Sequence, residues 1–370
     1  MLRNLSWRNF DFWLLGAVVL AIAFGIAMID SAVAGNAELE GYPNRQATFA
    51  GIGIAVILLV AAIDYNYWLV LYRPIYGVMM ILLIFLFMSA RAVFGAARWF
   101  SVGTIFIQPT ELAKIVVILI LARYFQSTQD EPRDLRWIIT SLLWTMGLTI
   151  WILLQPNLSN VIVIIVLWVT LLWMNGLQIK HLVSFAVGGL ALLIVGFPFL
   201  QEYQQQRVLT FIFPDPNATY GETYNIEQAK IAIGSGGWLG KGYGQGSQVQ
   251  LRFLKVRHTD FIFSAISEEF GFVGALLVIF ILIFILWRCL RAALLARDTS
   301  GAMIAFGVAT LIFFQGAVNI AVNLNLIPVS GLPLPFISYG GSGLLSLMLG
   351  VGLVESVLMR QKGVGEHCSL

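Results

Sequence analysis

Asp260 is the side chain of this sequence best placed to act as a general base. It lies in His258-Thr259-Asp260-Phe261-Ile262-Phe263, between the basic end of a long polar connection and the start of an apolar run. A carboxylate at such a boundary can accept the proton of an attacking hydroxyl group. Aspartate is also a favoured helix N-cap residue, and from this segment alone capping is the more common explanation.

Glu111 and Lys114 are charges at the start of another apolar run, within Gln108-Pro109-Thr110-Glu111-Leu112-Ala113-Lys114. Their i, i+3 spacing places both on one face of a helix, where they can pair. Charged groups inside a membrane are costly and are functional candidates by default. A mutually neutralised structural pair is an equally good explanation, because ion pairs also arise for structural reasons.

Two further segments combine glycine with polar residues. The cluster at 234–246 is not a P-loop, because that motif needs glycine where Ser235 stands and Ser or Thr where Gly242 stands. It is either a flexible connection or a loop whose backbone N–H groups approach a diphosphate. The segment 327–343 contains three prolines and four glycines. Such backbone at membrane depth must be buried or line a wet cavity, so we expect a site on the outer face.

The composition requires a membrane around these groups. Of 370 residues, 59% are hydrophobic and only 11% are charged, whereas a soluble chain carries about 25% charged residues. The net charge of +3 is small and dispersed, which disfavours nucleic-acid binding, since that needs a concentrated basic face. Cys289 and Cys368 cannot form a disulfide framework, and no metal-ligand spacing occurs. The sequence leaves open whether a divalent cation takes part.

Apolar runs long enough to cross a bilayer, which needs roughly 20 residues per helix, recur along the chain. They lie near 10–30, 47–64, 74–90, 105–122, 137–154, 158–175, 182–200, 260–287, 301–326 and 340–359. We therefore expect an all-α integral membrane protein with about ten transmembrane helices, forming a single polytopic domain over 1–370. The first run lacks a small-residue cleavage site and is expected to remain as a helix. A long connection, about 201–259, separates the seventh helix from the eighth.

Positive charge assigns the two sides of the membrane. Cations flank the runs on one side at Arg3, Arg8, Arg73, Arg123, Arg133, Arg136, Lys180, Arg288, Arg291, Arg297, Arg360 and Lys362. The short loops on the other side carry only Arg45, Arg91 and Arg98. Under the positive-inside rule, both termini are cytoplasmic and the connection 201–259 is extracytoplasmic.

Together these segments resemble the SEDS family of cell-wall polymerases, which includes RodA and FtsW. The resemblance extends over about 10–360, with motifs in the same order: Arg98-Trp99, Gln108-Pro109-Thr110-Glu111-Leu112-Ala113-Lys114, Gln155-Pro156-Asn157, the glycine cluster, His258-Thr259-Asp260-Phe261-Ile262-Phe263, Glu268-Glu269-Phe270-Gly271 and Leu334-Pro335-Phe336-Ile337-Ser338-Tyr339-Gly340-Gly341-Ser342. Each motif is modest alone, but in register they are specific. The proline-rich Gly331-Leu332-Pro333-Leu334-Pro335 is closer to the RodA branch than to FtsW.

The resemblance implies ten spans, a large extracytoplasmic connection before the eighth, and polymerisation of lipid II in the bacterial cytoplasmic membrane. Asp260 matches the family's essential acidic residue, and Glu111 and Lys114 match its intramembrane pair. The other substrate-binding candidates are cations or belong to the last motif: Arg98, Arg207, Lys241, Ser338, Gly340 and Gly341. The implied partners are lipid II, membrane lipids and a class B penicillin-binding protein that supplies the transpeptidase.

Some positions depart from the family pattern: Asn157 replaces the usual Asp, Lys255-Val256 a common Pro-Glu, and Gly343 a usual Ser.

In the implied reaction a sugar 4-hydroxyl attacks the anomeric carbon of a second molecule and the lipid diphosphate leaves. Cations can stabilise the charge that develops on this leaving group. A transporter that flips lipid II would use the same lipid and a similar cavity, and a non-catalytic scaffold would leave Asp260 without a task. The polar groups lie toward the outer face, which favours the polymerase.

Overall fold

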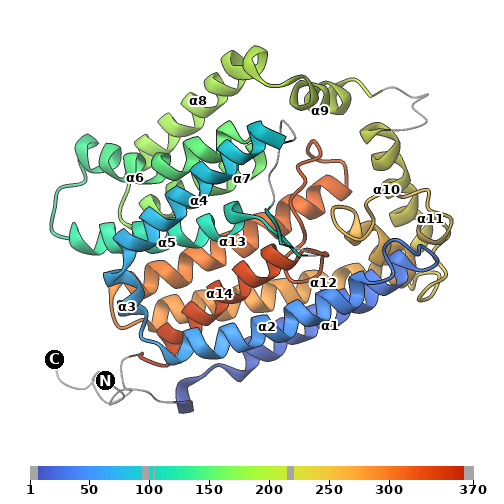
Figure 1. Cartoon of the computed structure of the whole chain (residues 1–370), viewed down its shortest axis with the longest axis horizontal. Coiled ribbons are helices and arrows are strands. Elements are labelled where there is room, and N and C mark those ends of the chain that lie inside the picture. The colour runs from blue at the N-terminus through green and yellow to red at the C-terminus, as the bar shows by residue number, and fades with distance from the viewer. Residues whose placement is uncertain (1–6, 94–99, 103–104, 215–220, 362–370) are drawn as a thin grey trace.

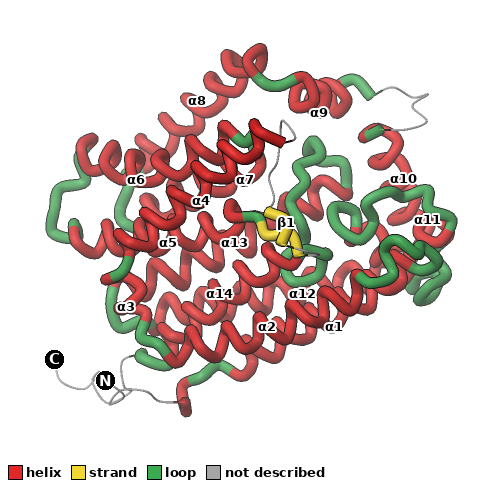
Figure 2. Tube along the Cα trace, in the orientation of Figure 1, coloured by secondary structure: helices red, strands yellow, loops and turns green. Residues whose placement is uncertain are grey.

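The computed structural model describes residues 7–93, 100–102, 105–214 and 221–361, and helices dominate it (Figure 2). A helix overlaps each range expected to span: α1 (Phe12–Val33), α2 (Tyr42–Ala62), α4 (Tyr72–Val93), α5 (Pro109–Ser127), α6 (Leu135–Leu154), α7 (Leu158–Met174), α8 (Ile179–Gly196), α12 (Ile262–Leu295), α13 (Thr299–Asn323) and α14 (Gly341–Leu358). Among the described helices, those long and apolar enough to cross a membrane are α1, α2, α6, α12, α13 and α14. The chain is therefore a multi-pass helical membrane protein, and the count of ten spans stays a prediction.

The bundle is built around α13 and α14. Figure 1 shows these two helices between α1 and α2 on one side and α4, α6 and α7 on the other. α14 packs along α2, while α13 packs along α12, α5 and α7. A short antiparallel ladder of β1 (Phe100–Val102) and β2 (Ile105–Ile107) contacts α14, and it is the only β-sheet in the described part of the chain.

The connection between α8 and α12 is folded onto the bundle. Its described part contains α9 (Glu202–Ile212), α10 (Glu222–Gly236) and the short α11 (Ser247–Gln250). α10 packs against α12. A small apolar core joins the connection to α12 and α13 through Ile226, Ala229, Leu254, Phe261, Val322 and Val329. The connection therefore has a defined position relative to the start of α12.

α12 is interrupted at Gly271, whose φ of 65° and ψ of −160° are not helical. The backbone groups left at this break bond to the glycine cluster instead: Lys241 N to Glu268 O at 3.0 Å, Gly242 N to Glu269 O at 2.9 Å, Phe272 N to Gly237 O at 2.8 Å and Val273 N to Trp238 O at 3.2 Å. An unpaired backbone group in lipid would be costly. The glycine cluster thus completes the hydrogen bonding of the broken helix. The N–H groups of Lys241 and Gly242 are therefore not available to a diphosphate.

Gly240 is a position in this contact where a side chain would clash with the backbone. Its φ is +82°, and an added Cβ would lie 2.2 Å from the carbonyl oxygen of Glu269. The left-handed conformation alone costs a non-glycine residue about 1–2 kcal/mol. We expect Gly240→Ala to lower the thermal unfolding midpoint of the purified protein. Gly234→Ala is the control, because its Cβ would meet no atom within 4 Å. Equal midpoints for the two variants would contradict the close contact.

α1 begins and α14 ends at the same end of the bundle (Figure 1). The Asp11 backbone N–H donates to Oε2 of Glu355 at 2.9 Å, and the Asp11 carboxylate accepts from Nε of Arg288 at 2.6 Å. The same carboxylate caps α1 by accepting from the N–H groups of Trp13 and Leu14. Glu355, the acidic residue of the last apolar run, therefore anchors the start of α1.

Candidate active site

Asp260 lies just outside α12, in a partly exposed position. The helix begins at Ile262 with Phe261 as its N-cap residue. The N–H of Ser264 in the first turn donates to Oδ1 of Asn323 on α13 at 3.0 Å. Asn323 of α13 therefore caps the first turn of α12. Capping was the alternative role for Asp260, and this contact weakens that alternative.

Two buried asparagines of α13 hold the backbone of Asp260. Nδ2 of Asn319 and Nδ2 of Asn323 donate to its carbonyl oxygen at 3.0 and 2.9 Å. Together with Gln315 they are spaced four residues apart, so three buried amides share one face of the helix. We call these three residues the amide stripe. The sequence analysis missed it, although amides at i, i+4 and i+8 in an apolar run are a readable signal.

Segment 327–343 holds the two residues that precede Asp260. Oγ of Ser338 donates to the carbonyl of Thr259 at 2.7 Å and accepts from Leu334 N at 2.9 Å. Tyr339 N donates to the carbonyl of His258 at 2.9 Å. Three consecutive carbonyls are thus fixed from α13 and from this segment, which preorganises the position of the carboxylate. The hydroxyl of Ser338, predicted to contact substrate, is engaged in this support.

Gly340 and Gly341 connect the same segment to α14. Gly340 N donates to Oε1 of the buried Gln46 at 3.2 Å, and Nε2 of Gln46 donates to the Ser338 carbonyl at 3.2 Å. At Gly341 an added Cβ would lie 2.4 Å from the ring of Phe49. Close packing of α14 on α2 therefore requires this glycine, whatever contact it makes with substrate.

Aromatic side chains surround the backbone of this site. The rings of Tyr42 and Tyr339 stack with centroids 4.2 Å apart, and His258 lies edge-on to Tyr42 at 5.4 Å. Burial, with a smaller effect from the neighbouring guanidinium of Arg257, lowers the pKa of His258 to about 4. The imidazole is therefore neutral at physiological pH and adds no positive charge near Asp260.

Glu111 and Lys114 form the buried ion pair that their spacing predicted. Nζ of Lys114 lies 2.7 Å from Oε2 of Glu111 and donates to Oδ1 of Asn160 on α7 at 3.2 Å. Asn160 in turn donates to the hydroxyl of Thr110, and Ser346 of α14 donates to the Glu111 carbonyl at 2.6 Å. The pair thus joins α5, α7 and α14 inside the bundle.

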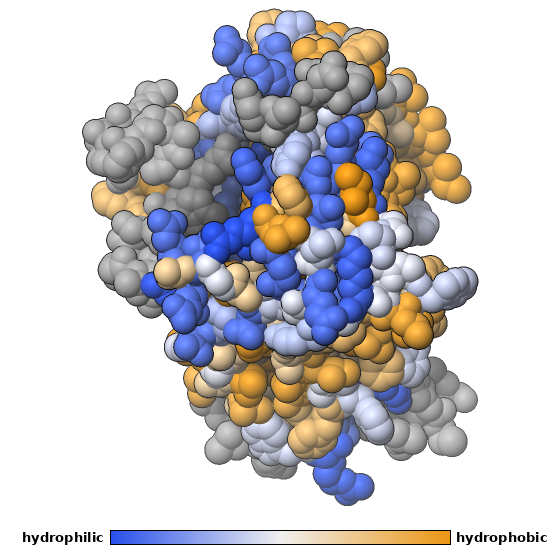
Figure 3. Space-filling view, turned by 90° about the vertical axis from the view of Figure 1, so that its right-hand side faces the viewer, coloured by the Kyte–Doolittle hydropathy of each residue, from blue (hydrophilic) through white to orange (hydrophobic). Residues whose placement is uncertain are grey.

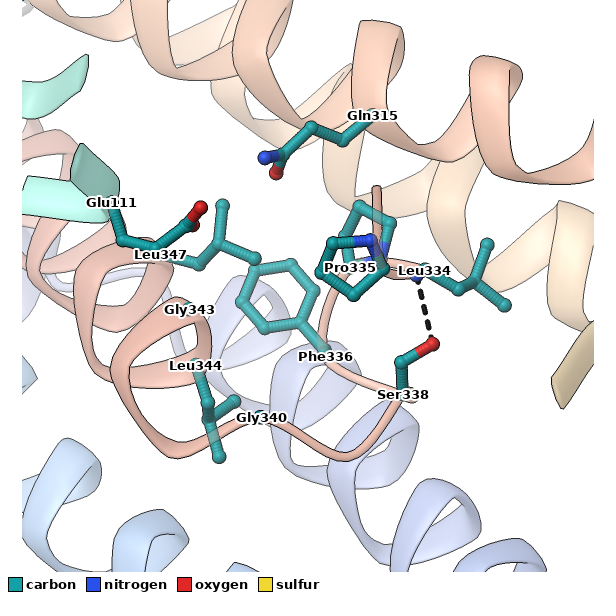
Figure 4. Close-up of a pocket in the computed structure, with 11 residues that line it drawn as sticks. Glu111, Gln315, Leu334, Pro335, Phe336, Ser338, Gly340, Gly343, Leu344 and Leu347 are labelled. Atoms are coloured by element: carbon teal, nitrogen blue, oxygen red, sulfur yellow. Dashed lines mark hydrogen bonds between the residues drawn. The ribbon is translucent and has the colours of Figure 1, made fainter. Parts of the chain in front are cut away.

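A small cavity separates this pair from the segment that supports Asp260 (Figure 4). Glu111 and Gln315 contribute polar groups to its wall, and residues of 333–340 and of α14 complete it. The space open to water is about 10 Å³. Glu111 of the intramembrane pair and Gln315 of the amide stripe therefore line the same small cavity.

Two of the cations predicted to stabilise the leaving group, Lys241 and Arg207, have different partners in the structure. Nζ of Lys241 lies 2.7 Å from Oε1 of the buried Glu268, beside the break in α12. Arg207 on α9 donates to the carbonyl of Val329 at 3.4 Å, which brings it to segment 327–343. Arg98 lies outside the described residues. The structure therefore commits Lys241 to Glu268 and brings Arg207 to the segment that supports Asp260.

The end of the molecule that carries the connection is polar. Figure 3 shows hydrophilic side chains gathered over the middle of this face and hydrophobic ones toward its edges. Within the described residues, no group of three or more His, Cys, Asp or Glu side chains is arranged to hold a metal ion. The fold and this site define an integral membrane protein with a supported carboxylate at one end of its helix bundle.

The family follows from comparison with known proteins. A family model described as "Cell cycle protein" (FTSW_RODA_SPOVE) matches residues 11–363. The chain therefore belongs to the FtsW/RodA/SpoVE family, as the resemblance of its motifs predicted.

Relatives of known name match over most of their length. "Peptidoglycan glycosyltransferase MrdB" of Escherichia coli K12 is 36% identical over 328 residues, which cover 87% of each chain. "Probable peptidoglycan glycosyltransferase FtsW" of Aliivibrio salmonicida is 32% identical over 363 residues, 95% of this chain and 87% of that one.

Solved structures show the same fold. One, described as "Structural coordination of polymerization and crosslinking by a peptidoglycan synthase complex", has a TM-score of 0.81 at 29% identity and covers 95% of this chain and 98% of its own. The rod shape determining protein RodA of Thermus thermophilus has a TM-score of 0.72 at 29% identity and covers 96% and 99%.

Proposed function

We propose that this protein is a peptidoglycan glycosyltransferase that polymerises lipid II at the outer face of the bacterial cytoplasmic membrane. The observation that carries the proposal is the supported position of Asp260, whose carbonyl is held by two buried amides. Asp260 occurs in a chain that matches proteins named peptidoglycan glycosyltransferase over most of their length. A polymerase needs a proton acceptor at this boundary, and Asp260 supplies it.

The reaction follows from the groups at this boundary. The 4-hydroxyl oxygen of one lipid-linked sugar forms a bond to the anomeric carbon of a second molecule. The hydroxyl proton passes to the Asp260 carboxylate, and the bond from the anomeric carbon to the lipid diphosphate breaks. A diphosphate leaves readily when cations stabilise its charge, a role we assign to Arg98 and Arg207. The ion pair of Glu111 and Lys114 supports the site from within the membrane, and Ser338, Gly340 and Gly341 form its wall.

Polymerisation by purified components tests this function. The full-length protein is incubated with lipid II, alone and together with a class B penicillin-binding protein from the same genome, and glycan strands are separated on a gel. We expect strands to form, and to form faster with the partner, which would supply crosslinking by transpeptidation. Transport of lipid II across vesicles without strand formation would instead identify a flippase.

We also propose ten spans with both termini in the cytoplasm and the connection 201–259 outside. Cys289 is buried and cannot report sidedness, so both native cysteines are first replaced by alanine. Lys255→Cys should then react with a membrane-impermeant thiol reagent in intact cells, and Gln129→Cys should react only after lysis. The native side chains of Lys255 and Gln129 are both exposed. The opposite pattern would invert the orientation.

A further inference from the structure

The amide of Gln315 lies at the inner end of the amide stripe and lacks a protein partner. The side chain is 1% exposed and points into the cavity toward Glu111 (Figure 4). Among the described residues, none accepts a hydrogen bond from its Nε2. A buried amide left unpaired is unfavourable. A water molecule can donate or accept, so the need for a partner does not depend on which way the amide is oriented.

The cavity has the size and the polar groups that a buried water needs. Its volume of about 10 Å³ is close to that of one water-sized probe, and buried waters typically make about three hydrogen bonds. The wall offers the carboxylate of Glu111 on α5 and the amide of Gln315 on α13. Around them the wall is apolar, with Pro335, Phe336, Leu344 and Leu347.

We propose that this cavity binds a single water molecule, which donates to the Glu111 carboxylate and accepts from the Gln315 amide. The water joins the intramembrane ion pair to the amide stripe, whose outer members Asn319 and Asn323 hold Asp260. Gln315 then stabilises the folded protein through the water. The proposal concerns the folded protein and holds or fails independently of the reaction.

Gln315→Met tests the water by the sign of its effect on stability. The substitution keeps the length of the side chain and removes the amide. If the cavity were dry, loss of an unpaired amide would raise the thermal unfolding midpoint. If the water is present, it loses a partner, and we expect the midpoint to fall by about 2–4 °C. A midpoint that rises or stays unchanged overturns the proposal.

Gly343→Ala tests the same water from the opposite wall. An added Cβ would lie 3.5 Å from Oε2 of Glu111, an ordinary contact distance. In a dry cavity the methyl group would fit, and alanine would stabilise the helix. With water bound, the methyl group displaces it, and the midpoint falls. Gly188→Ala in α8 is the matched control for helix propensity, because that glycine is exposed and its Cβ would meet no atom within 4 Å.

The double variant separates one shared water from two unrelated structural effects. Gln315→Met removes a partner of the water that Gly343→Ala displaces, so together they should lower the midpoint by less than the sum of the single effects. Gln315→Met combined with Gly188→Ala should be additive. Additive effects in the first pair would overturn the proposal. Because the readout is thermal unfolding, a failure of the proposed reaction in the lipid II assay would be recognised separately.

Discussion

Asp260→Asn is expected to lower the rate of lipid II polymerisation about 100- to 10,000-fold, the range typical of general-base catalysis. Asparagine keeps the size of the side chain but removes the proton acceptor. The contacts from Asn319 and Asn323 reach the backbone carbonyl, which the substitution retains. Because Asn323 also caps Ser264, the thermal unfolding midpoint should change little.

Asp130→Asn is the control for this substitution. Asp130 is exposed in the connection between α5 and α6, and we expect its variant to polymerise at the parental rate. Rates are measured with purified proteins at equal concentration, after their unfolding midpoints have been compared. If a folded Asp260→Asn protein formed glycan strands at the parental rate, the base would have to be another group.

The second large effect is expected at the intramembrane pair. Glu111→Ala and Lys114→Ala each leave one buried charge without its partner, which typically costs about 3–5 kcal/mol. In the exchanged double variant, Glu111→Lys with Lys114→Glu, the charges can still pair. The amide of Asn160, now an acceptor for Lys114, can turn and donate to the new carboxylate. We therefore expect both single variants to unfold at lower temperature than the exchanged variant.

Lys230→Ala provides the comparison, since Lys230 is an exposed lysine on α10, and its loss should leave the midpoint near the parental value. Polymerase activity is measured on the same samples. If the exchanged variant is as unstable as either single variant, pairing is not what the two residues contribute. If it is stable but inactive, the identity of the charge near the cavity matters to the reaction.

The positions of the long helices could be predicted because a bilayer sets helix length independently of tertiary contacts. The break at Gly271 could not, since a single glycine inside a long run does not by itself mark the end of a helix. Its backbone conformation depends on hydrogen bonds to residues 237–242, which approach α12 only when the connection folds. The same dependence explains why the sequence predicts a loop over residues 201–259, although their described part contains three helices.

In the candidate site, too, contacts within one helix could be predicted from the sequence, whereas contacts made by tertiary packing could not. The pair of Glu111 and Lys114 is set by spacing within one helix, so the sequence predicted it. The partner of Lys241 is Glu268, a choice made by the packing of the connection, which no local pattern contains. The support of Asp260 by Asn319 has a signal in the sequence, because the amide stripe has a helical period, but that period does not identify the backbone carbonyl that the amide contacts.

In the orientation that we propose, residues 237–242 leave the ribosome before α12 and must cross the membrane as part of a segment without its final structure. α12 then enters the bilayer with four backbone groups that have no partner until the earlier segment returns to them. With this orientation, insertion of the helix is completed from outside the membrane, when the segment that has already crossed folds against it. A lesion confined to the outer segment would accordingly be handled by membrane quality control as a helix that failed to insert.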